Sequence, residues 1–346
     1  MGSFFIEFRD PLFSIIILFG IIFMIPFFSY WWGRYKTKDN HQYLDKFLAQ
    51  FHVLPSEVEI KKMIHQGELS EKSWLLLADT YTKNGDFEKA VEIYTELLFY
   101  NKNSENAKEI MFLLGKTYFK AGFLGRSRDV FLEILKRNPR TPQALHYLLL
   151  VYEYMKDYKS AQEVLEPLEQ LNENITKDTL YLKILSLLSS KDEEITTKLI
   201  HFYQEHQILE RMIFEYLFKH DPSIAWEIFP LQKASKIADL FWQLPKEKVD
   251  FEKVNNSEFL QELYSAKGYI SSVNSSSIFE LNILIHLKGK ANTTLGFEYI
   301  CTTCKVAYPF SFHRCSNCHS IDSVELEYNL VRDFSKEQYE TGHSFL

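Results

Sequence analysis

Four cysteines near the C-terminal end of the chain have a spacing typical of metal ligands. They form two C-x-x-C pairs, Cys301–Cys304 and Cys315–Cys318, which ten residues separate. Each pair predicts a tight turn, here called a knuckle, whose two thiolates converge. Two knuckles supply four sulfurs in a tetrahedron, a ligand set that suits zinc and iron alike. We therefore predict one metal ion, iron or zinc, bound by Cys301, Cys304, Cys315 and Cys318; the alternative is a set of reduced thiols without metal.

A site closed by four cysteines restricts the chemistry that its metal can perform. The sulfurs fill every position of a tetrahedral ion, so zinc-dependent hydrolysis is disfavoured. With iron, one-electron transfer is an alternative, but a structural role is the simpler interpretation. His313 and His319 flank the second pair. We expect neither to be a ligand, because the cysteines already complete the shell.

The residues around the two pairs favour short strands. Phe297–Ile300 and Val324–Tyr328 contain the β-branched and aromatic residues that strands prefer. We therefore expect a small β unit at 297–330 that carries both knuckles. Residues 289–296 interrupt the helical pattern and predict a hinge before this unit, and the polar run at 271–277 predicts a loop.

Composition favours helices for the rest of the chain. The length of 346 residues suggests about two domains. Only 12 glycines and 10 prolines are available for turns, and 46% apolar with 25% charged residues is the balance of a folded chain. The net charge of −7 gives no general basic surface for nucleic acid. Nucleic-acid binding is therefore not expected.

A pattern recurs at close to the 34-residue period of tetratricopeptide repeats. Clear copies fall near 71–104, 108–141 and 142–175, and degenerate copies extend to 288. Small residues such as Ala78 and Gly115 let paired helices approach, while Gly85 suits the turn between them. The predicted fold class is mainly α, with leading helices at 34–70 and a tetratricopeptide-repeat α-solenoid at 71–288.

The first helix of each copy normally lines the concave face of such a solenoid. The candidate partner groove consists of Phe112, Lys116, Phe119, Lys120, His146 and Tyr154. A simpler interpretation, which we favour, is that the two phenylalanines pack between helices and that the lysines are merely solvated. A solenoid of this kind suits protein or peptide binding.

No catalytic motif is visible in the sequence. Gly115-Lys116-Thr117 is similar to the end of a phosphate-binding loop, but position 110 is Ile and the segment lies inside a predicted helix. We find no H-E-x-x-H, G-x-S-x-G or G-x-G-x-x-G motif. The chain is therefore not expected to be an enzyme.

Residues 11–33 predict an N-terminal transmembrane helix. They contain no charged residue and no histidine, and as a helix they span about 33 Å, enough to cross the hydrocarbon core of a bilayer. Arg34, Lys36 and Lys38 follow immediately, so the positive-inside rule places the bulk of the chain on the cytoplasmic side. A cleaved signal peptide is disfavoured, because its apolar run would be shorter and preceded by basic residues.

This order of elements resembles the lipopolysaccharide assembly protein B family of the bacterial inner membrane, whose C-terminal domain is rubredoxin-like. The likeness is strongest in Leu114–Tyr118 with Ala121–Leu124, continues through Ala144-Leu145, and includes Tyr299 and His313-Arg314 beside the knuckles. Departures are Lys305, where the family usually has Gly, and Ser316, where it usually has Pro. Gly is favoured at the first position because the backbone of a knuckle tends towards positive φ.

The resemblance implies a non-enzymatic adaptor, anchored in the inner membrane by a single span, that regulates lipopolysaccharide synthesis. Its implied partners are a membrane-bound ATP-dependent metalloprotease and the lipid A deacetylase that this protease degrades; the chain could also form a homo-oligomer. In the family the metal is needed for function, so the resemblance implies that the four cysteines of this chain are metal ligands. Two alternatives remain: a scaffold for another envelope or motor complex, and a redox protein that requires iron.

Overall fold

The computed structural model describes residues 24, 57–66, 70–100, 106–190, 192–287 and 292–333. The predicted membrane span at 11–33 lies outside these residues except for Met24, as does most of the leading segment at 34–70. Among the described residues, no helix is both long and apolar enough to cross a membrane. The chain divides into an N-terminal unit, Met1–Glu173, and a C-terminal unit, Asn174–Leu346.

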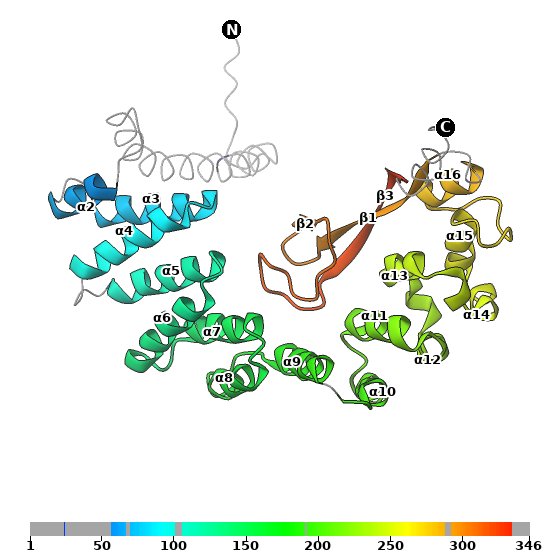
Figure 1. Cartoon of the computed structure of the whole chain (residues 1–346), viewed down its shortest axis with the longest axis horizontal. Coiled ribbons are helices and arrows are strands. Elements are labelled where there is room, and N and C mark those ends of the chain that lie inside the picture. The colour runs from blue at the N-terminus through cyan, green and yellow to red at the C-terminus, as the bar shows by residue number, and fades with distance from the viewer. Residues whose placement is uncertain are drawn as a thin grey trace, which may run out of the picture. The chain divides into compact units, whose positions relative to one another are not determined.

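Helix pairs build the described part of the N-terminal unit. A short helix, α2 (Glu57–Gln66), precedes three pairs, which Figure 1 labels α3 to α8. The pairs are α3 (Glu71–Asn84) with α4 (Phe87–Tyr100), α5 (Ala107–Lys120) with α6 (Leu124–Arg137), and α7 (Pro142–Tyr154) with α8 (Tyr158–Gln170). Each pair falls within one of the three clear copies of the sequence repeat.

Local signals in the sequence explain the ends of these helices. The Ser70 side chain accepts a hydrogen bond from the Ser73 N–H and caps the start of α3. Gly85 ends the same helix with φ of 87°, a left-handed conformation that costs glycine little. The Asp157 side chain caps α8 through the Ser160 N–H.

Small residues determine how closely the paired helices approach. Trp74, Ala78, Ala90 and Tyr94 are buried between α3 and α4. A Cβ added at Gly115 of α5 would lie 2.9 Å from the Phe131 ring of α6. Gly115 therefore serves the contact between helices, and the Gly-Lys-Thr triplet that it begins lies within helix α5.

The C-terminal unit starts with helix pairs and then becomes irregular. Its first four helices are α9 (Thr176–Ser189), α10 (Ile195–His206), α11 (Glu210–His220) and α12 (Pro222–Ile228). Shorter elements follow: the 3-10 helix η1 (Leu231–Ile237), α13 (Ala238–Gln243), the 3-10 helix η2 (Lys246–Lys248), α14 (Phe251–Asn255), α15 (Glu258–Ala266) and α16 (Phe279–Leu287).

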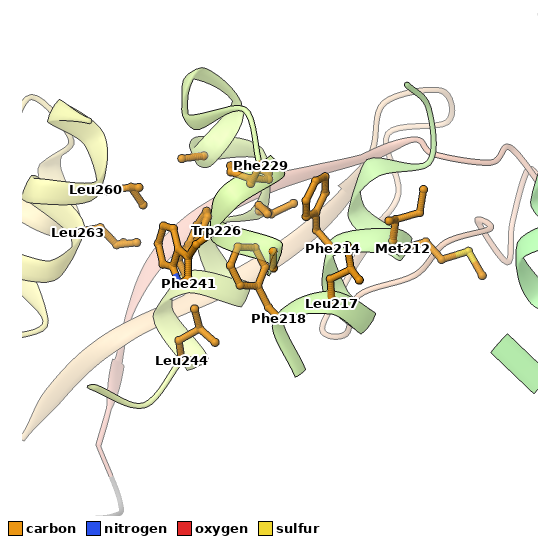
Figure 2. Close-up of a cluster of buried hydrophobic side chains, with 14 of the residues drawn as sticks. Met212, Phe214, Leu217, Phe218, Trp226, Phe229, Phe241, Leu244, Leu260 and Leu263 are labelled. Carbon is orange, nitrogen blue, oxygen red and sulfur yellow. The ribbon is translucent and has the colours of Figure 1, made fainter. Parts of the chain in front are cut away.

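Residues 231–266, within the stretch predicted to hold degenerate repeats, consist of short α-helices and 3-10 helices. Pro230 and Pro245 directly precede the two 3-10 segments, and proline has no N–H with which to continue a helix. Large aromatic side chains fill the core of this region. In the N-terminal unit, by contrast, small residues let the helices of a repeat pack closely. Figure 2 shows this cluster, in which Phe218, Trp226 and Phe241 pack with ring centroids 5.0 to 5.3 Å apart.

A three-stranded antiparallel sheet completes the C-terminal unit. Its strands are β1 (Thr293–Cys301), β2 (Ala307–Tyr308) and β3 (Val324–Arg332), in the order β2-β1-β3. β1 pairs with β3 from Thr293↔Arg332 to Cys301↔Val324. Of the hinge expected at 289–296, residues 289–291 lie outside the described residues, and Thr293–Gly296 belong to β1. Their pairing with β3 could not be predicted from local sequence.

One face of the sheet belongs to the hydrophobic core of the C-terminal unit. Leu295 is buried in this core, and Phe297, Tyr328 and Leu330 pack against it. The opposite face carries Glu298, Glu325 and Glu327, which are exposed. The helices therefore support the sheet from one side only.

Candidate metal centre

The two cysteine pairs form knuckles with the same hydrogen-bond pattern. In the first, the Cys301 N–H donates to the Val306 carbonyl at 3.0 Å, and the Lys305 N–H donates to the Cys301 carbonyl at 2.8 Å. In the second, the Cys315 N–H donates to Ser320 and the His319 N–H donates back to Cys315, both at 2.9 Å. Two segments that share only the spacing of their cysteines thus adopt one local structure.

Each knuckle bends through a residue with positive φ immediately after its second cysteine. Lys305 has φ of 60° and His319 has φ of 61°. Side chains rarely adopt this left-handed region, and glycine does so most easily. The expectation of positive φ at Lys305 is confirmed, and His319 occupies the matching position of the second knuckle.

The four sulfurs lie together. All four are within 4.8 Å of one another. The Sγ atoms of Cys301 and Cys318 are 3.6 Å apart, as are those of Cys304 and Cys315. A tetrahedral ion with bonds of about 2.3 Å to sulfur holds its ligands about 3.8 Å apart. The spacing therefore fits such an ion. It is too long for a disulfide bond, and all four cysteines are free thiols.

The surroundings of the Cys301 and Cys315 sulfurs favour thiolates, the form that binds metal. Burial disfavours ionisation of Cys301, but hydrogen bonds from the Ser320 and Ser323 hydroxyls and from N–H groups of its own knuckle outweigh burial and lower its pKa to about 5. Burial likewise opposes ionisation of Cys315, yet hydrogen bonds such as that from the Cys318 N–H lower its pKa. Burial raises the pKa of Cys318 to about 11. Each knuckle thus offers one thiol already disposed to ionise.

Hydroxyl groups surround the cluster as a second layer of contacts. Ser320 Oγ lies 3.0 Å from the sulfur of Cys318 and 3.4 Å from that of Cys301. The Tyr308 hydroxyl lies 3.3 Å from the Cys315 sulfur. Such donors orient metal-bound thiolates and reduce their charge. The donor set and its surroundings therefore fit a soft cation such as zinc or iron.

Arg314, next to the second knuckle, joins the knuckle to helix α9. Its guanidinium donates to Asp178 Oδ1 at 2.9 Å and to the His319 carbonyl at 3.0 Å. It also lies over the Tyr181 ring, 5.0 Å from the centroid. One side chain therefore bonds both to the backbone of the second knuckle and to the first helix of the C-terminal unit.

A buried ion pair makes a second connection. Arg211 of α11 and Asp239 of α13 form a bidentate pair whose side chains are only 8% and 1% exposed. Tyr299, two residues before the first knuckle, donates to Asp239 at 3.0 Å. Arg211 also donates to Ser311 Oγ at 2.8 Å. The segment between the knuckles and the strand before them are both bonded to this pair.

Sequence reasoning missed these connecting residues. Asp239 is the only charged residue in the run Ile237–Trp242, whereas Arg211 follows Glu210 and precedes the apolar residues Met212–Phe214. A lone charge in such a run is costly to bury without a partner. That signal points to a buried pair, but only the fold shows which two charges meet.

The two histidines near the second pair are not part of the sulfur cluster among the described residues. His313 Nε2 lies 3.2 Å from a carboxylate oxygen of Glu215, and this contact lowers the pKa of the glutamate. His319 supplies the positive φ described above. The His313 side chain therefore contacts Glu215, whereas His319 contributes to the knuckle through its backbone.

The six candidate groove residues lie on α5 and α7 of the N-terminal unit. Phe112 and Phe119 pack against Tyr147 with centroids 5.4 and 5.8 Å away, and Phe119 contacts Tyr154 at 5.2 Å. The interpretation of the phenylalanines as packing residues thus agrees with their contacts, although both remain only half-buried and Tyr154 is 50% exposed.

The polar members of this set differ in their surroundings. Burial lowers the pKa of Lys116, and the charges of Lys120 and Lys83 act in the same direction. Lys120 is exposed. His146 Nε2 lies 3.4 Å from Glu173 Oε2. The face formed by α5 and α7 therefore combines aromatic rings with two lysines that make no ion pair with another described residue.

The tetratricopeptide repeat family matches the chain at residues 71–104, the first copy of the sequence pattern. No curated protein matches the chain. Among solved structures, a tetratricopeptide repeat protein from Parabacteroides merdae is 16% identical, with a TM-score of 0.39 over 72% of this chain and 96% of that chain. YrrB, described as a TPR protein with an unusual peptide-binding site, is 17% identical, with a TM-score of 0.34 over 54% and 93%. The chain thus carries a tetratricopeptide repeat and, near its C-terminal end, a cluster of four cysteines.

Proposed function

We propose that the protein is a non-enzymatic adaptor that binds protein partners through its helix pairs. The observation that carries this proposal is the tetratricopeptide repeat at 71–104, followed by two further helix pairs of similar length. Repeats of this kind stack into extended surfaces that suit protein binding. The aromatic rings and lysines of α5 and α7 are the side chains that we expect to contact a partner.

We further propose that Cys301, Cys304, Cys315 and Cys318 hold one zinc or iron ion with a structural role. When bound, the ion fixes two knuckles that would otherwise be separate turns. Arg314 then connects the second knuckle to α9 by its bond to Asp178, and Tyr299 connects the first knuckle to α13 by its bond to Asp239. The ion thereby stabilises the C-terminal unit, and four sulfur ligands leave no position for a substrate.

The narrower role that we propose is regulation of lipopolysaccharide synthesis at the bacterial inner membrane. The support is the resemblance in Leu114–Leu124, in the segment around Ala144 and in the residues beside the knuckles. The predicted span at 11–33 would hold the repeats near a membrane-bound ATP-dependent protease, which raises the effective concentration of the two proteins. The client would be the lipid A deacetylase.

Depletion of the protein in its native cell tests this narrower role. We expect the half-life of the deacetylase to lengthen and lipopolysaccharide to accumulate. Re-expression of the wild-type chain should restore rapid degradation, while a form with Lys116→Ala and Lys120→Ala should restore less. An unchanged half-life would refute regulation of the deacetylase and favour the alternative scaffold for another envelope or motor complex.

A further inference from the structure

One edge of the C-terminal sheet has no backbone partner among the described residues. In the order β2-β1-β3, the nine-residue strand β3 is an outer strand. The Thr302 N–H donates to Ser323 at 2.7 Å and the Asp333 N–H donates to Asn292 at 3.0 Å. These bonds extend the β1–β3 ladder by one residue at each end and fix which residues of β3 are bonded to β1.

Hydrogen-bonded and non-bonded residue pairs alternate along an antiparallel ladder. From Ser323 and Asp333 inwards, the backbone groups of Glu325, Glu327, Asn329 and Val331 therefore point towards β1. Those of Val324, Leu326, Tyr328 and Leu330 point to the outer edge. No backbone hydrogen bond joins this outer edge to another part of the described chain.

The same strand separates two chemically different faces. The side chains of Leu326, Tyr328 and Leu330 lie on the core face, because they stand opposite Tyr299, Phe297 and Leu295. Glu325 and Glu327 lie on the solvent face with Glu298, which stands directly opposite Glu327. The three carboxylates are exposed and form no ion pair with other described residues. A strand beside β3 would meet the exposed carboxylates of Glu325 and Glu327 on the solvent face.

A cavity lies along the core face of β3. It has a volume of about 530 Å³, and Val324, Leu326 and Tyr328 line it from the strand. Leu209, Met212, Phe229 and Ile237 contribute apolar surface from the helical side, and the charged residues Glu210, Arg211, Lys233, Lys236 and Asp322 also line the cavity. This volume can receive side chains of an added segment that point to the core face.

We propose that the outer edge of β3 binds an extended protein segment in which basic and apolar residues alternate. The segment adds antiparallel to β3 as a fourth strand, an established mode of peptide recognition. Its apolar side chains enter the cavity, and its lysines or arginines lie beside Glu325 and Glu327. This surface is separate from the repeat surface of the proposed function and does not depend on it.

Charge disfavours one register in which a second copy of the chain could occupy this edge. Two β3 strands paired antiparallel about Leu326 would place Glu325 of one copy opposite Glu327 of the other, and like charges directly across strands are destabilising. Glutamates on an edge strand also prevent unwanted pairing. Here they act selectively, because a basic strand is attracted where an acidic strand is repelled.

The probe for this proposal is an eight-residue peptide of alternating lysine and valine, titrated against the full chain by fluorescence anisotropy. Two N-methylated versions of the peptide test the backbone geometry. In the antiparallel arrangement, valine N–H groups face β3 and lysine N–H groups face away. We expect methylation of the valines to abolish binding and methylation of the lysines to preserve it; the reverse result would contradict the antiparallel arrangement.

Charge reversal tests the faces of the strand. The variant Glu325→Lys with Glu327→Lys should weaken binding of the lysine peptide by about tenfold and gain binding of a glutamate–valine peptide. Glu227→Lys with Glu247→Lys changes the net charge equally at exposed positions on α12 and η2, and it should change affinity little. On binding, hydrogen exchange of the Leu326 and Tyr328 amides should slow.

Three results would overturn the proposal. One is a lysine peptide that does not bind the wild-type chain. Another is equal binding of the two methylated peptides, which would show attraction without strand pairing. The third is an equal loss of affinity in the two charge-reversal variants.

Discussion

At the scale of single residues, the cysteines and the buried ion pair make separate contributions. Replacing Cys315 by Ser removes one of four thiolates from the cluster, so we expect the purified chain to lose its metal. Thr303→Ala, an exposed position in the first knuckle, is the matched control and should retain one ion per chain. Elemental analysis of both variants decides the matter, and full metal content in Cys315→Ser would show that the ligand assignment is wrong.

The pair of Arg211 and Asp239 tests the connection between the sheet and the helices. Asp239→Ala leaves a buried guanidinium without its partner, so it should lower the free energy of unfolding by about 3–5 kcal/mol. The double variant Arg211→Met with Asp239→Leu removes both charges and should be closer to the wild type. Chemical denaturation of the C-terminal transition measures both. A double variant as unstable as Asp239→Ala would show that the loss of stability does not come only from leaving one buried charge unpaired.

At the scale of secondary-structure elements, two glycines in adjacent helices make opposite predictions. A Cβ at Gly115 would meet Phe131 at 2.9 Å, whereas nothing lies within 4 Å of one at Gly125. Gly115→Ala should therefore destabilise the N-terminal unit by about 1–3 kcal/mol. Gly125→Ala should stabilise it by about 0.5–1 kcal/mol, because alanine is the better helix former. Effects of the same sign in thermal unfolding would contradict the close packing of α5 on α6.

The elements also differ in how far local sequence determines them. The pairs α3 to α8 could be predicted because small residues, caps and turns recur with the period of the repeat. The elements from η1 to α14 could not, since their ends depend on Pro230, Pro245 and an aromatic core assembled from distant positions. The start of β1 was missed for a similar reason: Thr293 and Thr294 are strand residues only because Arg332 and Val331 pair with them.

The cysteine site shows the same division. The spacing of the four cysteines was sufficient to predict that they meet, and the departure at Lys305 pointed to a backbone of positive φ. Arg314 with Asp178, and Tyr299 with Asp239, could not be paired from sequence, because more than 50 residues separate the members of each pair. The ligands are therefore a local property of the sequence, and their attachment to the helices is a property of the fold.

At the scale of the whole molecule, metal removal should act on one unit. The cysteine cluster and the helices bonded to it all belong to the C-terminal unit. Treatment with a strong chelator under reducing conditions should lower the unfolding temperature of that unit and leave the helical signal of the N-terminal unit largely unchanged. Calorimetry before and after chelation, with readdition of zinc as the control, measures this effect. An equal loss in both transitions would mean that the ion stabilises the chain as a whole.

The helix pairs of the N-terminal unit are the proposed binding surface for protein partners. Affinity capture from the native cell, with mass spectrometry of the captured proteins, tests this proposal. We compare the wild-type chain with two variants: Lys116→Ala with Lys120→Ala on α5, and Lys136→Ala with Lys159→Ala at exposed positions on α6 and α8. We expect specific partners that are captured by the wild type and by the α6–α8 variant but are depleted with the α5 variant. Capture that is unaffected by the α5 substitutions, or the absence of any specific partner, would contradict it.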